Sequence, residues 1–415
     1  MTQNNPGTEH LDASIPVDKP ANGRGPVRIL QIIHTLDPKS GGPAEAIRQI
    51  AHHYAPVEHV GHVLTLDDPN ASFLQDLPFP VHAIGPAHST YAYSPRLVPW
   101  LLENQHNYDG FVIHGLWQYI GIAVWRAFAG KKPYIAFPHG MLDPYFKHAF
   151  PLKHLKKVLY WYPFEYRVLR DAHSVFFTCG AENELAQQSF ALHHWHAQIV
   201  PFGASPPEGD PAHYRAVFAT AFPVLAQRRF ILFLGRIHPK KGCDLLLEAF
   251  ACVARTDTGL DLVFAGPDQT GWREKLTALA HSFGIGDRVH WTGMVEGEMK
   301  WGAFYSCEAF ALPSHQENFG IAVAEALACG KPVLLSDKVN IWADVQRAGA
   351  AIVAADTLQG TQSVLEQWIA LSPAGRVTMC ENALQCFKSH YDMSVNACTI
   401  VEAFGRIINS AKPAT

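Results

Sequence analysis

The stretch that decides the fold is RFILFLGRIHPKKGCDLLLEAF, residues 229–250. It begins with an apolar run of the kind that fills a parallel sheet covered on both faces, and a helical pattern follows from about Cys243. A short loop with Lys240 and Lys241 joins the two, and Gly242 admits the helix. Basic side chains at a helix N-terminus favour an anion site, because free N–H groups and the helix dipole add to their charge. The alternative is a solvated turn with incidental cations.

The same alternation of apolar runs and amphipathic stretches extends in both directions along the chain. The runs before this stretch are VRILQIIH, HVLTL, GFVIH, PYIAFPHG and SVFFTCG, and those after it are DLVFAG, RVHWTGMV, AFALPS and KPVLLS. Such alternation predicts β-α units and mostly parallel sheets. Residues 200–214, which are dense in Pro and Gly, interrupt the rhythm as a domain boundary does. We therefore predict an α/β fold with two doubly wound, Rossmann-like domains.

The predicted organisation has four parts. Residues 1–26 are expected to be a flexible leader, since they lack the apolar core of a signal peptide. Residues 27–204 form the N-terminal Rossmann-like domain, and residues 205–390 form the C-terminal one. Residues 391–415 hold a C-terminal helix, which we expect to pack back on the N-terminal domain.

The composition excludes several classes of protein. With 17% charged residues and a formal net charge of −4, the chain gives no reason to expect nucleic acid as a partner. Its eight cysteines include no C-x-x-C pair, so neither a metal site nor a disulfide framework is expected, and a reducing cytosol fits best. The most apolar window, residues 110–130, is interrupted by His114, Gln118 and Arg126. It therefore indicates a buried strand and helix, because a membrane span needs about 20 cleanly apolar residues.

A second informative stretch is HQENFGIAVAEALACG, residues 315–330, which places Glu317 and Glu325 around an apolar helical run. Gly330 suits the C′ position of that helix. The two carboxylates suggest a metal pair, an acid/base pair, or the two ends of one ligand site. A helical rise of 1.5 Å per residue separates them by roughly 12 Å, which is too far for a shared metal or a hydrolase pair. The spacing suits an elongated polar ligand such as a nucleoside-diphosphate sugar, whereas Glu325 alone would be taken for an exposed helix carboxylate.

These motifs together carry a family resemblance. GRIHPKKG, followed later by HQENFGIAVAE, resembles the retaining glycosyltransferases of family 4, whose GT-B fold has two facing Rossmann-like domains. The E-x7-E pattern from Glu317 to Glu325 is that family's signature. The resemblance implies that the N-terminal domain binds the acceptor and the C-terminal domain binds the donor. It further implies that Arg236 and Lys241 hold the donor diphosphate. Glu317 would then bond the donor sugar, and Glu325 the ribose.

The resemblance also covers residues of the N-terminal domain. Gly41 and Gly42 in SGGP match a Gly-Gly loop that lies near the donor phosphates in the family. His139 in FPHGMLDP matches a histidine at the edge of the sugar site, and we count it with the catalytic residues. His114 in VIHGLW is a weaker candidate for contact with the acceptor. Both histidines follow strands, where ligands of such domains bind, although a core histidine is the alternative for each.

Further donor contacts are implied within the C-terminal domain. Asn318, Phe319 and Gly320 would lie beneath the diphosphate, and Val295 in TGMV would border the base through its backbone. No cofactor is expected, since the nucleotide sugar is a substrate. No D-x-D motif occurs in the chain, so we expect no catalytic metal either.

Two departures from the family pattern are visible. After LLSD the family usually has a Gly-Gly-x-x-Glu turn, but this chain has KVNIWADV, so Asn340 and Trp342 are candidates for shaping a different pocket. The HG form around the histidine is not the commonest in the family, which suggests a subgroup that makes exopolysaccharides. The implied mechanism is transfer with retention at the anomeric carbon, in which preorganised charge stabilises the leaving diphosphate.

The acceptor is less well defined by the sequence. Residues 146–170 hold six lysines or arginines and one glutamate, interleaved with aromatic residues. This segment suits contact with an anionic bilayer and a lipid-linked acceptor. The alternative is a solvated cationic helix whose aromatic side chains lie in the core.

The function predicted is a retaining hexosyltransferase that uses UDP-hexose or GDP-mannose and extends a glycan in polysaccharide biosynthesis. We expect it in the cytoplasm, with the inner face of the plasma membrane as the place of any peripheral contact. A noncatalytic sugar-nucleotide-binding module and a sugar-nucleotide epimerase of the same fold are the alternatives. A dinucleotide oxidoreductase fits less well, because no strand is followed by G-x-G-x-x-G.

Overall fold

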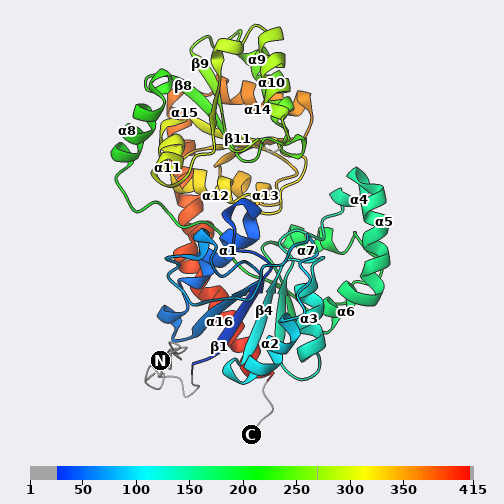
Figure 1. The fold of residues 1–415 in the computed structure, drawn as a ribbon. Helices are drawn as coiled ribbons and strands as arrows, with labels where there is room; N and C mark the ends of the chain where they lie inside the picture. The colour runs from blue at the N-terminus through cyan, green and yellow to red at the C-terminus, as the bar shows by residue number, and fades with distance from the viewer. Residues whose placement is uncertain (1–25, 269, 412–415) are drawn as a thin grey trace, which may run out of the picture.

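The computed structural model describes residues 26–268 and 270–411. The leader predicted for residues 1–26 therefore lies outside the described residues, apart from residue 26. Figure 1 shows two α/β domains, with the N-terminal domain in blue to green below and the C-terminal domain above. The predicted α/β class, with two doubly wound parallel sheets, is confirmed.

The N-terminal domain is built on a seven-stranded sheet in which all neighbouring strands are parallel. Across the sheet, its strands are β3 (Val81–Ala83), β2 (Val60–Thr65), β1 (Arg28–Ile33), β4 (Gly110–His114), β5 (Tyr134–Phe137), β6 (Ser174–Phe177) and β7 (Ala197–Ile199). Strands β4, β5 and β6 are buried along their whole length, which explains their continuous apolar runs. The strand order reverses between β1 and β4, and ligands of such sheets bind beside that point, at the carboxyl ends of the strands.

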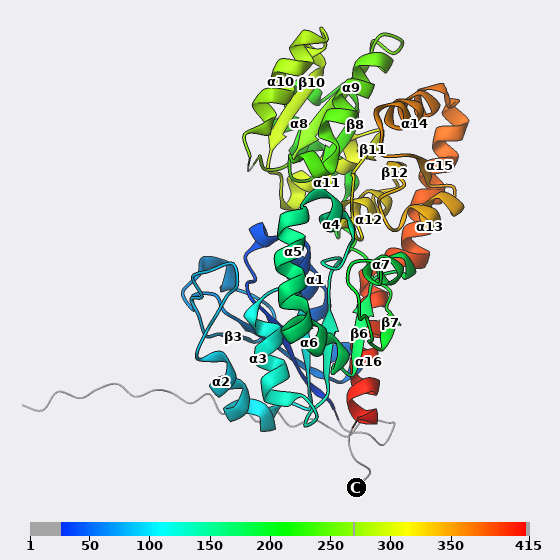
Figure 2. The same ribbon diagram turned by 90° about the vertical axis from the view of Figure 1, so that its right-hand side faces the viewer.

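Helices cover both faces of this sheet. They are α1 (Gly42–Ala51), α2 (Leu97–Asn104), α3 (Tyr119–Phe128), α4 (Tyr145–Ala149), α5 (Pro151–Tyr160), α6 (Tyr166–Arg170) and α7 (Gly180–Ala186). A π-helical turn, Trp161–Glu165, joins α5 to α6. Figure 2 shows α5 on the outside of the domain, with α4 reaching toward the C-terminal domain.

The C-terminal domain is built on a six-stranded parallel sheet. Its strands are β10 (Val289–Gly293), β9 (Leu260–Ala265), β8 (Arg229–Leu234), β11 (Ala309–Leu312), β12 (Val333–Ser336) and β13 (Ala351–Ala354). Its helices are α8 (Pro211–Ala221), α9 (Cys243–Val253), α10 (Trp272–Ser282), α11 (Gly297–Ser306), α12 (Ile321–Ala328), α13 (Trp342–Arg347), α14 (Leu358–Ala370) and α15 (Pro373–Cys386). The stretch at residues 229–250 supplies β8 and α9, as predicted.

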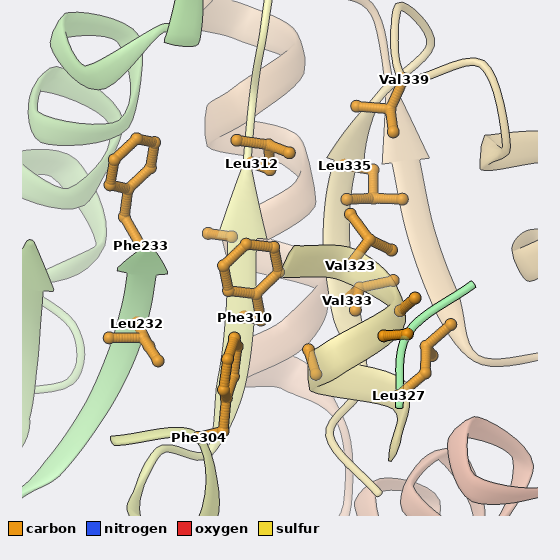
Figure 3. Close-up of a cluster of buried hydrophobic side chains, with 14 of the residues drawn as sticks. Leu232, Phe233, Phe304, Phe310, Leu312, Val323, Leu327, Val333, Leu335 and Val339 are labelled. Carbon is orange, nitrogen blue, oxygen red and sulfur yellow. The ribbon is translucent and has the colours of Figure 1, made fainter. Parts of the chain in front are cut away.

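Helix α12 owes its apolar sequence to its position against the sheet. Figure 3 shows Val323 and Leu327 among the side chains of β11 and β12, beside Phe310 and Leu335. The helix ends as predicted, with Gly330 in the left-handed region at the C′ position (φ 64°).

The chain passes between the domains twice. Between β7 and β8 it leaves the N-terminal domain, and it returns through α16 (Met393–Ser410). Ala204 and Asp392 pair as an isolated parallel β-bridge where the two crossings meet. Helix α16 then packs against the N-terminal domain, where Phe404 stacks on Phe176 of β6 at 5.3 Å between ring centroids. Within the described residues, no helix is both long and apolar enough to cross a membrane.

Candidate active site

A cavity of about 430 Å³ lies between the two domains. Its walls include residues from the loops that follow β1, β5, β8 and β11, so it lies at the carboxyl ends of both sheets. The predicted site residues that line it are Gly41, Gly42, His139, Arg236, Lys241, Glu317, Asn318, Phe319, Gly320 and Glu325. Val295 and His114 are not among its lining residues.

Lys241 and Glu317 form an ion pair at the centre of the C-terminal wall. Lys241 ends the 3-10 turn Pro239–Lys241, and the next residue is Gly242 in the left-handed region (φ 68°). A Cβ at Gly242 would collide with the carbonyl oxygen of Pro313, so only glycine lets this turn pack against the loop after β11. That close approach brings the lysine to the glutamate.

Glu317 keeps its negative charge because of the cations around it. Burial acts to raise the pKa of its carboxyl, but the charge and hydrogen bond of Lys241, together with the charges of Lys240 and Arg236, lower that pKa below its usual value. Glu317 is therefore a carboxylate at neutral pH and can only accept hydrogen bonds.

The backbone of Glu317 is held by the segment that departs from the family pattern. Glu317 pairs with Val339 as an isolated β-bridge, and its carbonyl oxygen accepts a hydrogen bond from the Asn340 N–H at 3.0 Å. The Asn340 side chain donates to Asn318 at 3.4 Å. Trp342 instead begins α13 and packs against the core. The bridge with Val339 and the hydrogen bonds of Asn340 thus hold the loop that carries Glu317. Trp342 does not line the cavity.

Glu325 forms the second ion pair of the cavity, with Lys300 of α11 at 2.5 Å. Burial raises the pKa of the Glu325 carboxyl, and the Lys300 charge offsets only part of that effect. Glu45 of α1, across the cleft, acts in the same direction as burial. The sequence reasoning did not identify Lys300.

The estimate of roughly 12 Å between the two glutamates assumed that the whole segment from Glu317 to Glu325 is helical, and that assumption was wrong. Helix α12 begins only at Ile321, after Gly320 in the left-handed region (φ 76°). Glu317 belongs to the extended loop before it, and Glu325 is the fifth residue of the helix, little more than one turn from its start. Both carboxylates nevertheless line the same cavity.

His139 lies on the N-terminal wall in a strained conformation, with φ 51°. Its ring stacks on Phe137 at 4.3 Å, and its Nε2 lies 2.9 Å from Nδ1 of His114. Burial lowers the pKa of His139 to about 3, so the ring is neutral. Because Nε2 is engaged by His114, Nδ1 is the ring nitrogen left for a ligand.

His114 does not face the cavity as predicted. It ends β4 with no exposed surface, so it cannot touch an acceptor and instead contacts the ring of His139. The side chain of Val295 is buried in the core of the C-terminal domain, and its predicted contact with the base through the backbone stays a prediction. For His114, a position at the end of a strand did not distinguish the cavity wall from the layer of side chains behind it.

Glu182 of α7 is a functional candidate that the sequence reasoning missed. Its buried carboxylate accepts hydrogen bonds from the Gly140 N–H at 2.7 Å and from both the N–H and the hydroxyl of Thr178 at 2.7 Å. It therefore fixes the turn that carries His139. The available sequence signal was an acidic residue in the first turn of a helix, four residues after the threonine that directly follows the preceding strand.

Gly41 and Gly42 begin α1 with open space beside them, since a Cβ at either position would have no neighbour within 4 Å. Gly41 has φ 88°, which favours glycine. The first N–H groups of a helix have no partners within that helix, so this end of α1 offers donors to an anion in the cavity.

Two family models match the chain. The model described as "Glycosyl transferase 4-like domain" matches residues 41–230, and "Glycosyl transferases group 1" matches residues 221–372. The chain belongs to the group 1 glycosyltransferases. The family 4 resemblance seen in GRIHPKKG and HQENFGIAVAE is thereby confirmed at the level of the family.

Solved structures similar to this one have the GT-B arrangement. Anabaena HepE, in complex with UDP and glucose, has a TM-score of 0.71 and 18% identity, covering 91% of this chain and 99% of that one. Sucrose-phosphate synthase from Thermosynechococcus elongatus has a TM-score of 0.73 and 19% identity, covering 93% and 100%. At these identities the likeness establishes the fold alone, which is the predicted GT-B fold.

Curated relatives match over part of their length. D-inositol 3-phosphate glycosyltransferase of Actinosynnema mirum is 32% identical over 161 residues, which are 37% of this chain and 39% of that protein. The enzyme of the same name from Saccharomonospora viridis is 31% identical over 178 residues, or 41% of each chain. The chain thus spans about two-fifths of the length of these relatives.

Proposed function

We propose that this protein transfers a hexose from a nucleoside-diphosphate sugar to a glycan acceptor, with retention at the anomeric carbon. The observation that carries the proposal is the convergence of Arg236, Lys241 and Glu317 with the first residues of α1 on one cavity between the domains. Cations and free N–H groups suit a diphosphate, and a permanent carboxylate suits sugar hydroxyls. UDP-hexose and GDP-mannose both fit this layout.

In the proposed complex, the donor lies along the C-terminal wall. Lys241 and Arg236 hold the diphosphate, with Asn318, Phe319 and Gly320 beside it. Glu317 accepts hydrogen bonds from the sugar hydroxyls. Glu325, oriented by Lys300, accepts hydrogen bonds from the ribose hydroxyls. Contact between the base and the backbone of Val295 belongs to the same proposal.

The proposed reaction breaks the bond between the anomeric carbon and the diphosphate oxygen, and the electron pair leaves with the diphosphate. The acceptor hydroxyl attacks from the same face, and its proton passes to the departing phosphate. Arg236 and Lys241 stabilise the negative charge that develops on the leaving group. His139, neutral and held by His114, bonds a sugar hydroxyl through Nδ1. No step in this scheme needs a catalytic metal or a cofactor.

The proposed acceptor is linked to a lipid and belongs to polysaccharide biosynthesis, such as that of an exopolysaccharide. Helix α5 supports this, because Leu152, Leu155 and Leu159 lie on one of its faces with 79%, 58% and 72% of their surface exposed. Lys156 lies beside them and would meet anionic headgroups. A solvated cationic helix does not explain three exposed leucines in register.

We place the protein in the cytoplasm, at the inner face of the plasma membrane. All eight cysteines are free, as is usual in a reducing compartment. Binding to vesicles with and without anionic lipid tests the contact. Leu155→Ser should weaken it, whereas Val395→Ser, an exposed apolar residue of α16, should leave it unchanged. Equal loss in both variants would refute contact through α5.

The experiment that tests the main proposal is a thermal-shift screen with UDP, GDP and their sugars, followed by assay of nucleoside diphosphate release. We expect one nucleotide to stabilise the protein by mass action and to be released when an acceptor is present. Binding without release for any acceptor would favour the noncatalytic module. Conversion of the donor sugar to its epimer without release of nucleoside diphosphate would favour the epimerase.

A further inference from the structure

Two further lysines approach one aromatic ring beside the donor cavity, and neither belongs to the two Lys–Glu ion pairs. Lys240 of the C-terminal domain and Lys157 of α5 both approach the ring of Phe146, with their ammonium nitrogens 5.2 and 5.4 Å from its centroid. Lys157 also lies 4.3 Å from the centroid of the Trp117 ring. Phe146 and Lys240 line the cavity, whereas Lys157 is not among its lining residues and reaches it through the ring of Phe146.

Neither lysine has a carboxylate partner. Within residues 26–268 and 270–411, no Asp or Glu oxygen lies within 4.0 Å of either ammonium group. The acids whose charges act on these lysines have other partners. Glu165 accepts a hydrogen bond from the Trp117 N–H at 3.2 Å, and Asp143 accepts one from Gln316 at 2.9 Å. Glu317 is paired with Lys241. Each ammonium group therefore lies over the face of one aromatic ring, and carboxylates act on it only from beyond ion-pair distance.

Both ammonium groups are partly removed from water. Burial is the main cause that lowers the pKa of Lys157 to about 8 and that of Lys240 to about 8. Glu165 opposes this effect at Lys157, and Glu317 opposes it at Lys240, whereas neighbouring cations add to it. Both side chains remain mostly protonated at neutral pH. A partly desolvated ammonium group without an ion-pair partner is stabilised when a ligand of opposite charge binds beside it.

The backbone holds this arrangement in place. The carbonyl oxygen of Lys240 accepts hydrogen bonds from the His315 N–H at 2.9 Å and from the Ser314 hydroxyl at 3.0 Å. The turn that carries Lys240 is therefore fixed to the loop that carries Glu317. Phe146 belongs to α4, which reaches toward the C-terminal domain in Figure 2.

We propose that Lys157, Lys240 and Phe146 form a subsite for the phosphate group of the acceptor. Two ammonium groups match the charge of a phosphate or diphosphate, for which lysine acts as a point charge. One cation comes from each domain, so the subsite faces the N-terminal side of the donor phosphates. The aromatic ring offers an apolar face to the group that carries the phosphate. This inference rests on the proposed function, since it assumes that Lys241 and Arg236 are occupied by the donor.

The test uses the full-length protein saturated with the nucleoside diphosphate that the thermal-shift screen selects, so that the donor phosphate site is filled. Three probes are titrated calorimetrically: inorganic pyrophosphate, glucose 6-phosphate and farnesyl diphosphate. Glucose and farnesol serve as uncharged counterparts. We expect at least one anionic probe to bind and neither uncharged one to do so. A preference for farnesyl diphosphate would identify a lipid-linked acceptor, and a preference for glucose 6-phosphate would identify a soluble one.

Lys157→Met is the decisive variant, because it removes the charge but keeps an unbranched side chain over Trp117. It should weaken binding of the anionic probe by about tenfold or more, and Lys157→Arg should largely retain it. Lys153→Met is the matched control, since Lys153 lies on the same helix, 4.9 Å from the exposed ring of Phe150. It should bind the probe as the wild type does.

Three outcomes would overturn the inference. The first is that no anionic probe binds the nucleotide-loaded protein. The second is that Lys153→Met and Lys157→Met weaken binding equally, which would indicate a general charge effect. The third is that Lys157→Met weakens binding of the nucleoside diphosphate itself, which would assign Lys157 to the donor site. If no nucleotide binds at all, the proposed function fails and this inference fails with it.

Discussion

The two ion pairs of the cavity have the same chemistry but different surroundings. Lys241–Glu317 lies among further cations, which hold the pKa of Glu317 below its usual value. Lys300–Glu325 lies on two helices, where burial and the charge of Glu45 raise the pKa of Glu325. The role of an ion pair therefore depends on the charges around it. The excess positive charge around Lys241 and Glu317 suits the binding of an anion. Lys300 and Glu325 have little excess positive charge around them, so Lys300 serves mainly to orient Glu325 as a hydrogen-bond acceptor.

The largest expected effect is on catalysis at the first pair. Lys241→Met and Glu317→Gln should each lower kcat for transfer by about 10²–10³-fold, because each removes charge preorganised for the transition state. The measurement is nucleoside diphosphate release with a saturating donor. Turnover like that of the wild type in either variant would contradict the assignment of the site.

A double variant separates structure from catalysis at this pair. Each single change leaves a partly buried charge without its partner, which lowers stability. Lys241→Met combined with Glu317→Gln should regain part of the lost melting temperature but none of the activity. If activity returned together with stability, the pair would be structural only.

At the second pair we expect a smaller effect, on binding. Glu325→Gln should raise KM for the donor by about 10–100-fold with little change in kcat, since a charged hydrogen bond contributes about 1.5–3 kcal/mol. Steady-state kinetics over a range of donor concentrations measures both constants. A loss confined to kcat would place Glu325 at the reacting carbon instead of the ribose.

The contributions of the two glutamates to the free energy of unfolding should change with pH in opposite directions. Because the folded pKa of Glu317 is lowered, its contribution is present above its ordinary pKa and is lost as pH falls through the lowered value. Because the folded pKa of Glu325 is raised, stability is lost as pH rises from the ordinary value through the raised one. The measurement is urea denaturation of both variants across this pH range. Glu317→Gln should abolish the loss of stability at low pH, and Glu325→Gln should abolish the loss as pH rises. Identical profiles would refute the difference between the pairs.

The smallest effect is expected from Glu45→Gln, which removes a negative charge facing Glu325 from the other domain. The donor KM should fall by no more than about twofold, since partly exposed charges contribute only a few tenths of a kcal/mol. The difference should disappear at high salt, where such charges are screened. Persistence of the change at high salt would point to altered packing of α1.

Much of the fold could be predicted because its signals are local. Apolar runs such as those of β8 and β11 are buried strands, and Gly330 ends α12 in the conformation that its position suggests. The positions of Glu317 and Glu325 in one cavity also followed from a short motif. In these cases the residues that decide the structure lie within a few turns of one another.

Partners from distant parts of the chain could not be predicted. Lys300 carries no motif, yet the fold brings it from α11 to within 2.5 Å of Glu325 in α12. Glu317 and Lys241 were both identified, but not as an ion pair. Similarly, the sequence could not reveal that the leucines of α5 are exposed, because burial depends on which face the tertiary structure covers. His114 was misplaced for the same reason.

The β-bridge between Ala204 and Asp392 has a mechanical consequence. The Ala204 N–H donates to the Tyr391 carbonyl oxygen, and the Met393 N–H donates to that of Ala204, both at 3.0 Å. The two chain crossings are thus fastened side by side. A single crossing would let the domains bend and twist about each other, but two fastened crossings resist twisting. We therefore expect the cavity to open and close by rotation about one axis, so that Lys157 of α5 and Lys240 return to the same relative position each time.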